Sequence, residues 1–305
     1  MRSDRFMADM EGNKDAKQFA QDVAFANTGD FHVRGASNLD WGMKDRLSRI
    51  FKPETGKTVM LAFDHGYFMG PTSGLERLDL LIPRLAKHAD CLMATRGAIR
   101  TSVPANYNKS IALRISSGSS ILQNDLSHES MVVDIEDAIR MNASAIAIQT
   151  FIGAEGQKET IEALNKAVNL GSRYSIPTLG VVAVGKEMER TNRFFLLATR
   201  MLAEFGAQIV KTYYCDDFEK VVAACPVPLV VAGGKKVPEK DALTLAYNSI
   251  QCGAAGVDMG RNIFQSEYPE GMLQAVNKVV HDGFTDKEAY AFYLDLANAN
   301  LQVNK

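Results

Sequence analysis

A lysine near the end of a short apolar segment offers the most reactive chemistry in this sequence. Lys211 lies in AQIVKTYY, where two tyrosines, Tyr213 and Tyr214, follow shortly after it. Among apolar side chains the pKa of an amine falls, because burial disfavours the ammonium form, and the free amine can attack a ketone. We therefore predict that Lys211 forms a Schiff base. Tyr213 is a candidate proton donor, although simple loop packing explains it equally well.

Asp64 and His65 form a second reactive pair, in the segment AFDHG. A carboxylate beside an imidazole provides proton donors and acceptors. Neighbouring strand residues point to opposite faces of a sheet, so both can act at one site only if the strand breaks at Gly66. Asp64 is the first candidate, and a structural hydrogen bond explains His65 equally well.

Two glycine-bearing segments, VVAGGKK and VDMGRN, have the residue types of a phosphate site. Gly233, Gly234 and Gly260 would let backbone amides approach phosphate oxygens without an intervening Cβ. Lys235 and Arg261 would supply positive charge, the arginine as a two-pronged donor. Each glycine singly is explained by a tight turn. Their occurrence at the ends of two successive apolar segments favours phosphate binding.

Eight apolar segments would position these residues. Amphipathic helical patterns alternate with them, which is typical of parallel strands joined by crossover helices and predicts a (β/α)8 TIM barrel with an N-terminal extension. A doubly wound sheet is the alternative, but no GxGxxG follows the first segment. In a barrel the reactive groups gather at the carboxyl ends of the strands. The expected strands lie within 58–66, 90–96, 110–116, 144–151, 178–185, 207–214, 228–234 and 255–261.

The rest of the chain limits its organisation and partners. We expect an N-terminal arm with a short helical segment in 1–50, the barrel in 51–285, and a C-terminal helix and tail in 286–305. The chain has 305 residues and a net charge of −2, so it has no bulk field to attract nucleic acid or an anionic membrane.

Cysteine usage and the N-terminal sequence predict a cytoplasmic protein without a metal. The four cysteines lack CxxC or CxxH spacing, and no set of histidines and carboxylates has the spacing of metal ligands. The N-terminus is polar and no segment has the length of a membrane span. Cys215 is the candidate thiol nucleophile and Lys186 the rival lysine, both weaker candidates than Lys211. Arg96 and Arg114 bind either anionic substrate groups or structural carboxylates.

The segments AFDHG, IVKTYY, VVAGGKK and GVDMGRNIFQ together resemble the Schiff-base barrel aldolases of the archaeal-type class I fructose-bisphosphate aldolase family. The resemblance runs from about 39 to 281 and includes the first, sixth, seventh and eighth predicted strands in order. It implies that Lys211 is the imine-forming lysine. It also implies that the glycines with Arg261 hold a phosphate, and that Asp64 and His65 lie in the acid and base region.

Longer segments, RLSRIF, GKTVMLAFDHGYFMGPTSGLER and GVDMGRNIFQS, are similar to an acetyl-transferring branch of this family that acts in autoinducer-2 degradation. This likeness implies a phosphorylated dione substrate, coenzyme A as co-substrate, and no bound cofactor. It also implies a homo-oligomer, commonly a decamer built from pentamers. The family's aldolases carry a tyrosine acid at the end of the fifth strand, where this chain has VVAVGKEM. That departure argues against ordinary aldol cleavage of a sugar bisphosphate.

Two other functions fit the same residues. One is a class I retro-aldolase that acts on a phosphorylated sugar without coenzyme A and releases an aldehyde. The other is a phosphosugar-binding protein that leaves its ligand unchanged.

Overall fold

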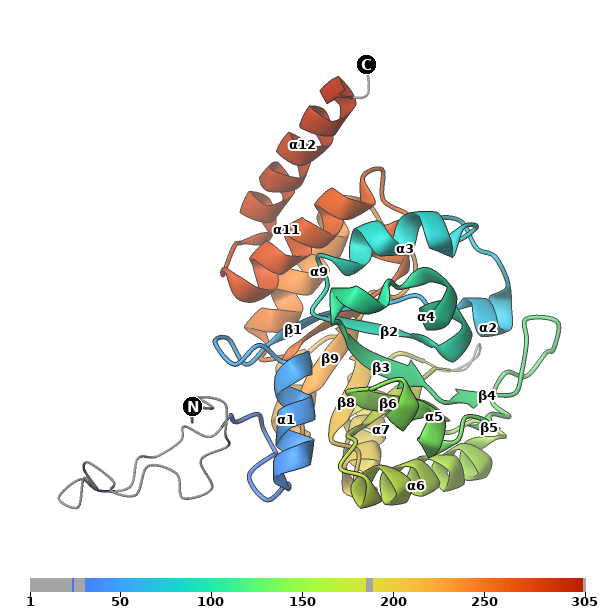
Figure 1. The fold of residues 1–305 in the computed structure, drawn as a ribbon. Coiled ribbons are helices and arrows are strands. Elements are labelled where there is room, and N and C mark those ends of the chain that lie inside the picture. Colours follow the sequence, from blue (N-terminus) through green and yellow to red (C-terminus); the bar gives the residue numbers. More distant parts are fainter. Residues whose placement is uncertain (1–23, 25–30, 185–188, 304–305) are drawn as a thin grey trace, which may run out of the picture. The chain divides into compact units, whose positions relative to one another are not determined.

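A closed barrel of eight parallel strands forms the centre of the protein, surrounded by helices (Figure 1). The predicted (β/α)8 barrel is confirmed. The structure is a computed structural model and describes residues 24, 31–184 and 189–303, so most of the expected N-terminal arm and Lys186 lie outside the described residues. Around the barrel the strands follow the order β1 (Thr58–Ala62), β10 (Gly256–Met259), β9 (Leu229–Ala232), β8 (Ile209–Tyr213), β7 (Thr178–Ala183), β6 (Ala145–Phe151), β3 (Ser110–Arg114) and β2 (Cys91–Thr95).

The strands are apolar on both faces because one face lines the barrel and the other packs under the helices. On β8, Ile209 belongs to the cluster inside the barrel, whereas Val210 packs in the cluster beneath the outer helices. Lys211 follows Val210 and points inward again, as the two-residue period of a strand requires. The outer helices are α3 (Leu78–Ala86), α4 (Arg96–Ser102), α5 (Ile135–Arg140), α6 (Gln157–Arg173), α7 (Asn192–Glu204), α8 (Phe218–Ala224), α9 (Glu239–Gln251) and α11 (Pro269–His281).

Helix α1 (Trp41–Ile50) packs its apolar face into the barrel interior. Leu47 and Ile50 are buried in the same cluster as Met60 and Ile209. The helix begins at Asp40, whose carboxylate accepts a hydrogen bond of 3.0 Å from the Met43 amide. The sequence WGMKDRLSRIF thus forms the predicted short amphipathic helix.

Short insertions follow several strands at their carboxyl ends and form the walls of that side of the barrel. They are helix α2 (Gly66–Met69) after β1, the hairpin of β4 (Ser116–Ser117) and β5 (Ser130–Met131) after β3, and helix α10 (Arg261–Phe264) after β10. A 3-10 turn (Ala105–Tyr107) follows α4, and the last helix, α12 (Asp286–Val303), packs against α9 and α11.

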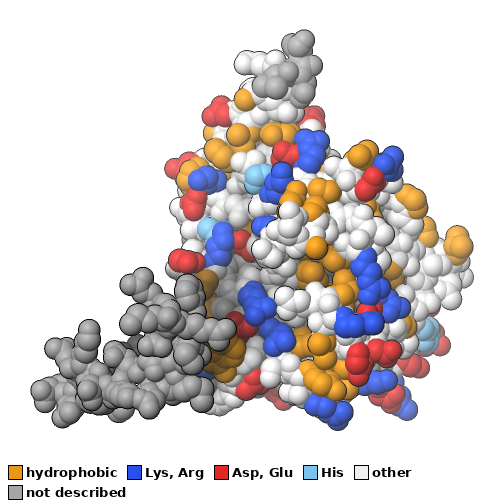
Figure 2. Space-filling view, viewed as in Figure 1, with side chains coloured by type: hydrophobic (Ala, Val, Ile, Leu, Met, Phe, Trp, Pro, Cys, Tyr) orange, Lys and Arg blue, Asp and Glu red, His pale blue; other side chains and the backbone are white. Residues whose placement is uncertain are grey.

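Charges of both signs are interspersed over the face of the molecule seen in Figure 2. This distribution agrees with the near-zero net charge of the sequence. Among the described helices, none combines the length and the apolar character that crossing a membrane would require.

A buried carboxylate ties together three segments at the amino ends of the strands. Asp90 Oδ2 accepts a hydrogen bond of 2.8 Å from the Val59 amide and lies 2.7 Å from His281 Nε2, while Oδ1 lies 3.0 Å from Lys52 Nζ. Burial acts to raise the pKa of Asp90, but the His281 and Val59 hydrogen bonds and the Lys52 contact outweigh it and lower the pKa. Contacts at the amino ends of the strands of such a barrel serve stability.

We predict that Asp90→Ala lowers the free energy of unfolding by about 3 kcal/mol, because it removes one partner of a buried pair and leaves the Val59 amide unpaired. Urea unfolding at pH 7 measures this. A carboxyl with a lowered pKa stabilises the fold above its unfolded pKa, so the difference between variant and wild type should shrink below about pH 4. Asp45→Ala, which removes an exposed pair with Arg49, is the control and should cost about 0.5 kcal/mol or less.

Candidate active site

A cavity of about 260 Å³ lies at the carboxyl ends of the barrel strands. Six residues singled out in the sequence line it: Lys211, Asp64, His65, Tyr213, Arg114 and Arg261. They lie in or directly after β1, β3, β8 and β10, which are far apart in the sequence. The closed barrel therefore brings the predicted reactive groups to one place.

The Lys211 amine forms an ion pair with Asp258 inside the barrel. Its Nζ atom lies 2.8 Å from Asp258 Oδ2 and 3.5 Å from Met93 Sδ. The Lys211 side chain is 12% exposed and that of Asp258 is 0% exposed. The two residues come from β8 and β10, with β9 between them, so both must project inward across the barrel.

This pair corrects the expectation that apolar walls lower the pKa of Lys211. Burial does act to lower it, but the charges of Asp258 and Asp64 outweigh burial, and the pKa of Lys211 is raised. Complete burial raises the pKa of Asp258, against the opposing effect of Lys211. The resting lysine is therefore protonated, and the carboxyl beside it is a better proton acceptor than an ordinary aspartate.

Asp64 and His65 both line the cavity because β1 ends at Ala62, earlier than the break expected at Gly66. The chain then turns into α2, so the two side chains no longer alternate across a strand. Burial acts to raise the pKa of Asp64, but the interactions with Arg114, His65 and Lys211 outweigh burial, and the pKa of Asp64 is lowered. Burial, aided by nearby cations, lowers the pKa of His65 despite Asp64. At neutral pH the site thus holds a carboxylate beside a neutral imidazole.

A buried arginine holds one wall of the cavity in place. Arg114 Nη1 lies 3.2 Å from Asp64 Oδ2, and its Nη2 donates to Glu129 Oε2 at 2.9 Å and to Gln149 Oε1 at 2.9 Å. The same Nη2 donates to the Tyr67 hydroxyl, which in turn donates to Glu129 Oε1 at 2.5 Å. The sequence left open whether Arg114 binds anionic substrate groups or structural carboxylates. In the structure it binds structural carboxylates.

Tyr213 also lines the cavity, with its ring 4.2 Å from the Arg190 guanidinium carbon. This stacking orients the ring at the end of β8. The following residue, Tyr214, packs on Phe218 with ring centroids 5.3 Å apart, so it serves loop packing.

Two weaker candidates from the sequence, Arg96 and Cys215, lie away from the cavity. Arg96 Nη1 donates to Asp137 Oδ2 at 3.0 Å on the outer helices. Burial raises the pKa of the Cys215 thiol to about 11, so the thiolate is scarce at neutral pH. Neither residue lines the cavity.

The two glycine-bearing loops are held together by one buried side chain. Asn262 donates through Nδ2 to the carbonyl oxygens of Gly233 at 2.7 Å and Lys235 at 3.2 Å, and its Oδ1 accepts from the Val237 amide at 2.9 Å. Asn262 therefore fixes the β9–α9 loop against α10. The sequence contained Asn262 within VDMGRN, but its side chain could not be distinguished there from that of a loop residue.

Local geometry explains why these positions are glycines. A Cβ at Gly260 would lie 2.4 Å from the Ala62 carbonyl oxygen and 2.9 Å from His65 Cε1, so β10 approaches β1 too closely for any side chain. Gly234 has a φ of +71°, which suits a glycine turn. The residues that line the cavity do not include Gly233, Gly234, Gly260 or the exposed Lys235.

Arg261 is the cation of these loops that lines the cavity. Within the described part of the chain, its Nε atom is buried without a hydrogen-bond partner. A buried guanidinium nitrogen without a partner loses stabilisation unless a ligand supplies an acceptor. Its position favours an anionic group bound at this edge of the cavity.

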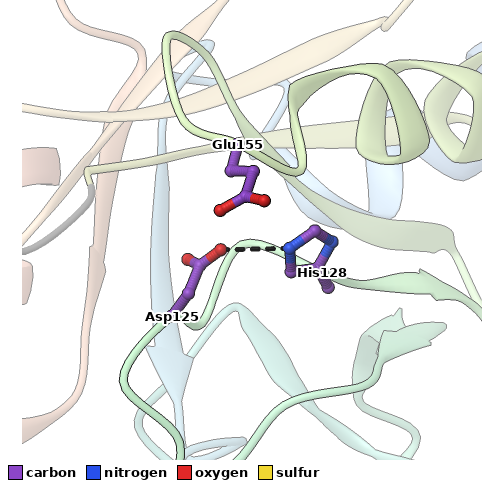
Figure 3. Close-up of side chains that lie close together, drawn as sticks. All are labelled: Asp125, His128 and Glu155. Atoms are coloured by element: carbon purple, nitrogen blue, oxygen red, sulfur yellow. Dashed lines mark ion pairs between the residues drawn. The ribbon is translucent and has the colours of Figure 1, made fainter.

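A group of possible metal ligands lies outside the cavity, in two loops (Figure 3). The side chains of Asp125, His128 and Glu155 approach one another, with ligand atoms all within 4.8 Å. His128 Nε2 lies 3.1 Å from Asp125 Oδ2, and Asp125 also accepts hydrogen bonds from the Ser127 amide and hydroxyl. Such exposed groups are common without an ion. The contacts of Asp125 with His128 and Ser127 lie within the β4–β5 loop.

Similarity to known proteins agrees with this site. The family model described as DeoC/LacD family aldolase matches residues 58–266, which is the whole barrel up to α10. The chain belongs to this family. The matched range includes Lys211, the central residue of β8.

Relatives cover nearly the whole chain. An uncharacterized aldolase of Pasteurella multocida is 53% identical over 95% of this chain and 99% of its own length. A 3-hydroxy-5-phosphonooxypentane-2,4-dione thiolase of Photorhabdus laumondii is 53% identical over 94% of this chain and 99% of its own. The crystal structure of an archaeal fructose 1,6-bisphosphate aldolase has a TM-score of 0.71 and 25% identity, covering 79% of this chain and 100% of that one. The resemblance stated from the sequence motifs is thereby confirmed.

We predict that Asp258→Asn slows the reaction of Lys211 with a ketone by about 10²-fold or more, because an amide cannot take the lysine proton. The experiment measures how fast the borohydride-trapped adduct forms, by mass spectrometry at a series of pH values. Removing Asp258 also removes the main interaction that raises the Lys211 pKa, so the pH of half-maximal trapping should fall. Faster trapping at pH 7 would show that Asp258 only restrains the amine. Asp216→Asn, an exposed carboxyl just after β8, is the control and should trap normally.

Proposed function

We propose that the protein is an acetyl-transferring thiolase, which moves the acetyl group of 3-hydroxy-5-phosphonooxypentane-2,4-dione to coenzyme A and releases dihydroxyacetone phosphate. The observation that carries this proposal is the buried Lys211 amine, paired with Asp258 and facing a cavity rimmed by Asp64, His65 and Arg261. The thiolase name of relatives at 53% identity supports the choice of reaction. We propose cytoplasmic autoinducer-2 degradation as its setting.

The substrate is anchored through its phosphate. Arg261, with its unpartnered Nε, receives the phosphate oxygens, and we propose that the loop amides of Gly233, Gly234 and Gly260 and the Lys235 ammonium approach them when the substrate is bound. The ketone next to the phosphomethyl group then lies beside Lys211. Charge-assisted hydrogen bonds of this kind fix both orientation and affinity.

Imine formation begins with a proton transfer from Lys211 to Asp258, whose raised pKa suits it to accept the proton. The free amine adds to the ketone carbon to give a carbinolamine, and loss of water gives the imine. The protonated imine is an electron sink next to the carbon–carbon bond that must break. Tyr213 and His65 lie at the cavity and exchange protons with the carbinolamine hydroxyl and the leaving water.

Carbon–carbon cleavage follows attack on the distant acetyl carbonyl. The neutral His65 imidazole takes the coenzyme A thiol proton, and the thiolate adds to the carbonyl carbon. Collapse of this adduct expels the neighbouring carbon as an enamine and releases acetyl-CoA. Protonation of the enamine and hydrolysis of the imine then free dihydroxyacetone phosphate and Lys211. No metal or bound cofactor takes part in this scheme.

A class I retro-aldolase that needs no coenzyme A is the second function compatible with Lys211. It lacks support from the thiolase names of the relatives. It would release an aldehyde without a thiol, so the product separates the two functions. The phosphosugar-binding alternative leaves its ligand unchanged.

We also propose that the subunits form a homo-oligomer, a decamer of two pentamers by family resemblance. Several large apolar side chains are exposed on the single subunit, and an assembly would cover those that lie at its interfaces. They include Trp41 at 80%, Leu197 at 56% and Leu301 at 61% exposure.

We predict that incubation with the phosphorylated dione and borohydride adds a stable mass to Lys211, located by peptide mass spectrometry. Lys211→Arg keeps the charge beside Asp258 but cannot form an imine, so both the adduct and acetyl-CoA formation should disappear. Lys166→Arg, on α6, should behave as wild type. Adduct on another lysine, or full turnover by Lys211→Arg, would contradict the proposed function.

We predict that Arg261→Met raises KM for the phosphorylated dione by about 10- to 100-fold, because a hydrogen bond to a charged group contributes about 1.5–3 kcal/mol. The unphosphorylated dione should be used equally well by variant and wild type. Steady-state kinetics on the two substrates measures the difference. An equal loss on both would place Arg261 in a role other than phosphate binding. Arg49→Met, on α1 at the opposite end of the barrel, is the control.

A further inference from the structure

A second hollow lies directly beside the cavity that holds Lys211. This groove has a volume of about 660 Å³ and runs between α2, the start of α3 and α4. The Lys211 cavity, at about 260 Å³, is at the small end of ligand pockets, which span about 300–1,000 Å³. It suits a five-carbon phosphodione and leaves little room for a second substrate, so a thiol donor must enter from an adjoining space.

The groove and the cavity share a wall. Asp64 and Tyr67 line both of them, while Lys211 and His65 line the cavity alone. Arg114 binds both wall residues, so their positions are fixed. A chain that lies in the groove therefore ends within reach of a substrate held in the cavity, on the side where Asp64 and Tyr67 meet.

The lining of the groove suits a slender, uncharged chain. Phe63 and Leu75 form its buried apolar floor. Gly66, Gly70 and Gly97 lie along it, and a Cβ at any of the three would meet no heavy atom within 4 Å. These glycines therefore leave open space beside the groove, although the φ of +71° at Gly70 itself favours a glycine there.

The charges at the outer end of the groove do not favour phosphate. Arg77 donates to Asp79 at 2.8 and 2.6 Å and is thereby neutralised, while Glu76 adds a negative charge. A neutral arm with two amides fits this lining better than a diphosphate does. The nucleotide end of a long thiol cofactor would remain outside.

We propose that this groove binds the pantetheine arm of coenzyme A and delivers its thiol past Asp64 and Tyr67 to the acetyl carbonyl of the imine-bound substrate. The inference rests on the proposed thiolase function and adds the site of the second substrate to it. Asp64 and Tyr67, which line both the groove and the cavity, place the inner end of such an arm next to the bound substrate.

The test fills the groove from Gly97, which lies in α4 and has a helical neighbourhood that tolerates larger residues. Gly97→Leu should raise KM for coenzyme A about tenfold or more, and KM for pantetheine by the same factor, at saturating dione. Gly97→Ala should give a smaller rise in both. Borohydride trapping at Lys211 should be unchanged in either variant. Lys158→Leu, which puts a leucine on the exposed face of α6, is the control.

The outcomes separate the groove from the reaction. An unchanged KM for coenzyme A in Gly97→Leu, with the wild type producing acetyl-CoA, would overturn the groove proposal alone. A rise for coenzyme A but not for pantetheine would assign the groove to the nucleotide, and lost trapping would assign it to the dione; both overturn the proposal. A wild type that makes no acetyl-CoA would overturn the proposed function and the groove together.

Discussion

The buried ion pair between Lys211 and Asp258 is the interaction on which the rest of the site depends. Removing either charge from water costs several kcal/mol, and the 2.8 Å contact between them offsets part of this cost. The pair keeps the amine in place as an ammonium until a substrate arrives. Because burial also raises the pKa of Asp258, the proton can pass to that carboxyl without solvent. The amine is then released where it is needed.

A closed barrel supplies the geometry that this pair requires. Lys211 and Asp258 lie on strands separated by β9, and only residues that project inward can meet across it. Small side chains such as Ala112, Ala145 and Ala147 fill the interior below, and α1 packs against them from the amino end. The reactive groups therefore lie above a dense apolar layer, with access from the carboxyl ends of the strands.

The sequence predicted the barrel well because its strands are nearly continuous apolar segments separated by amphipathic helices. It also identified Lys211, Asp64, His65 and Arg261 as neighbours, since all four follow or end such segments and the barrel rule places these ends together. Asp258 was missed, although a lone carboxylate within an apolar strand was a visible signal. The pKa direction of Lys211 was consequently wrong.

Other parts of the site depend on distances that no local pattern contains. Arg114 binds Glu129 and Gln149, which lie in the β4–β5 hairpin region and on β6. Tyr67 joins this network from α2, and its hydroxyl position is set by partners distant in the sequence. Side-chain type alone could not show whether Arg114 binds substrate or protein. The exact end of β1, which decides that Asp64 and His65 act together, likewise depends on tertiary contacts.

The Arg114 network has a consequence for how two substrates share the site. It fixes Asp64 and Tyr67, and these residues line both the cavity and the adjoining groove. Because Arg114 is bound on several sides and its side chain is 2% exposed, the wall cannot shift without leaving a buried charge unpaired. In the proposed reaction, this shared wall stays in place while the ketone in the cavity and the thiol in the groove approach the same bond from two sides.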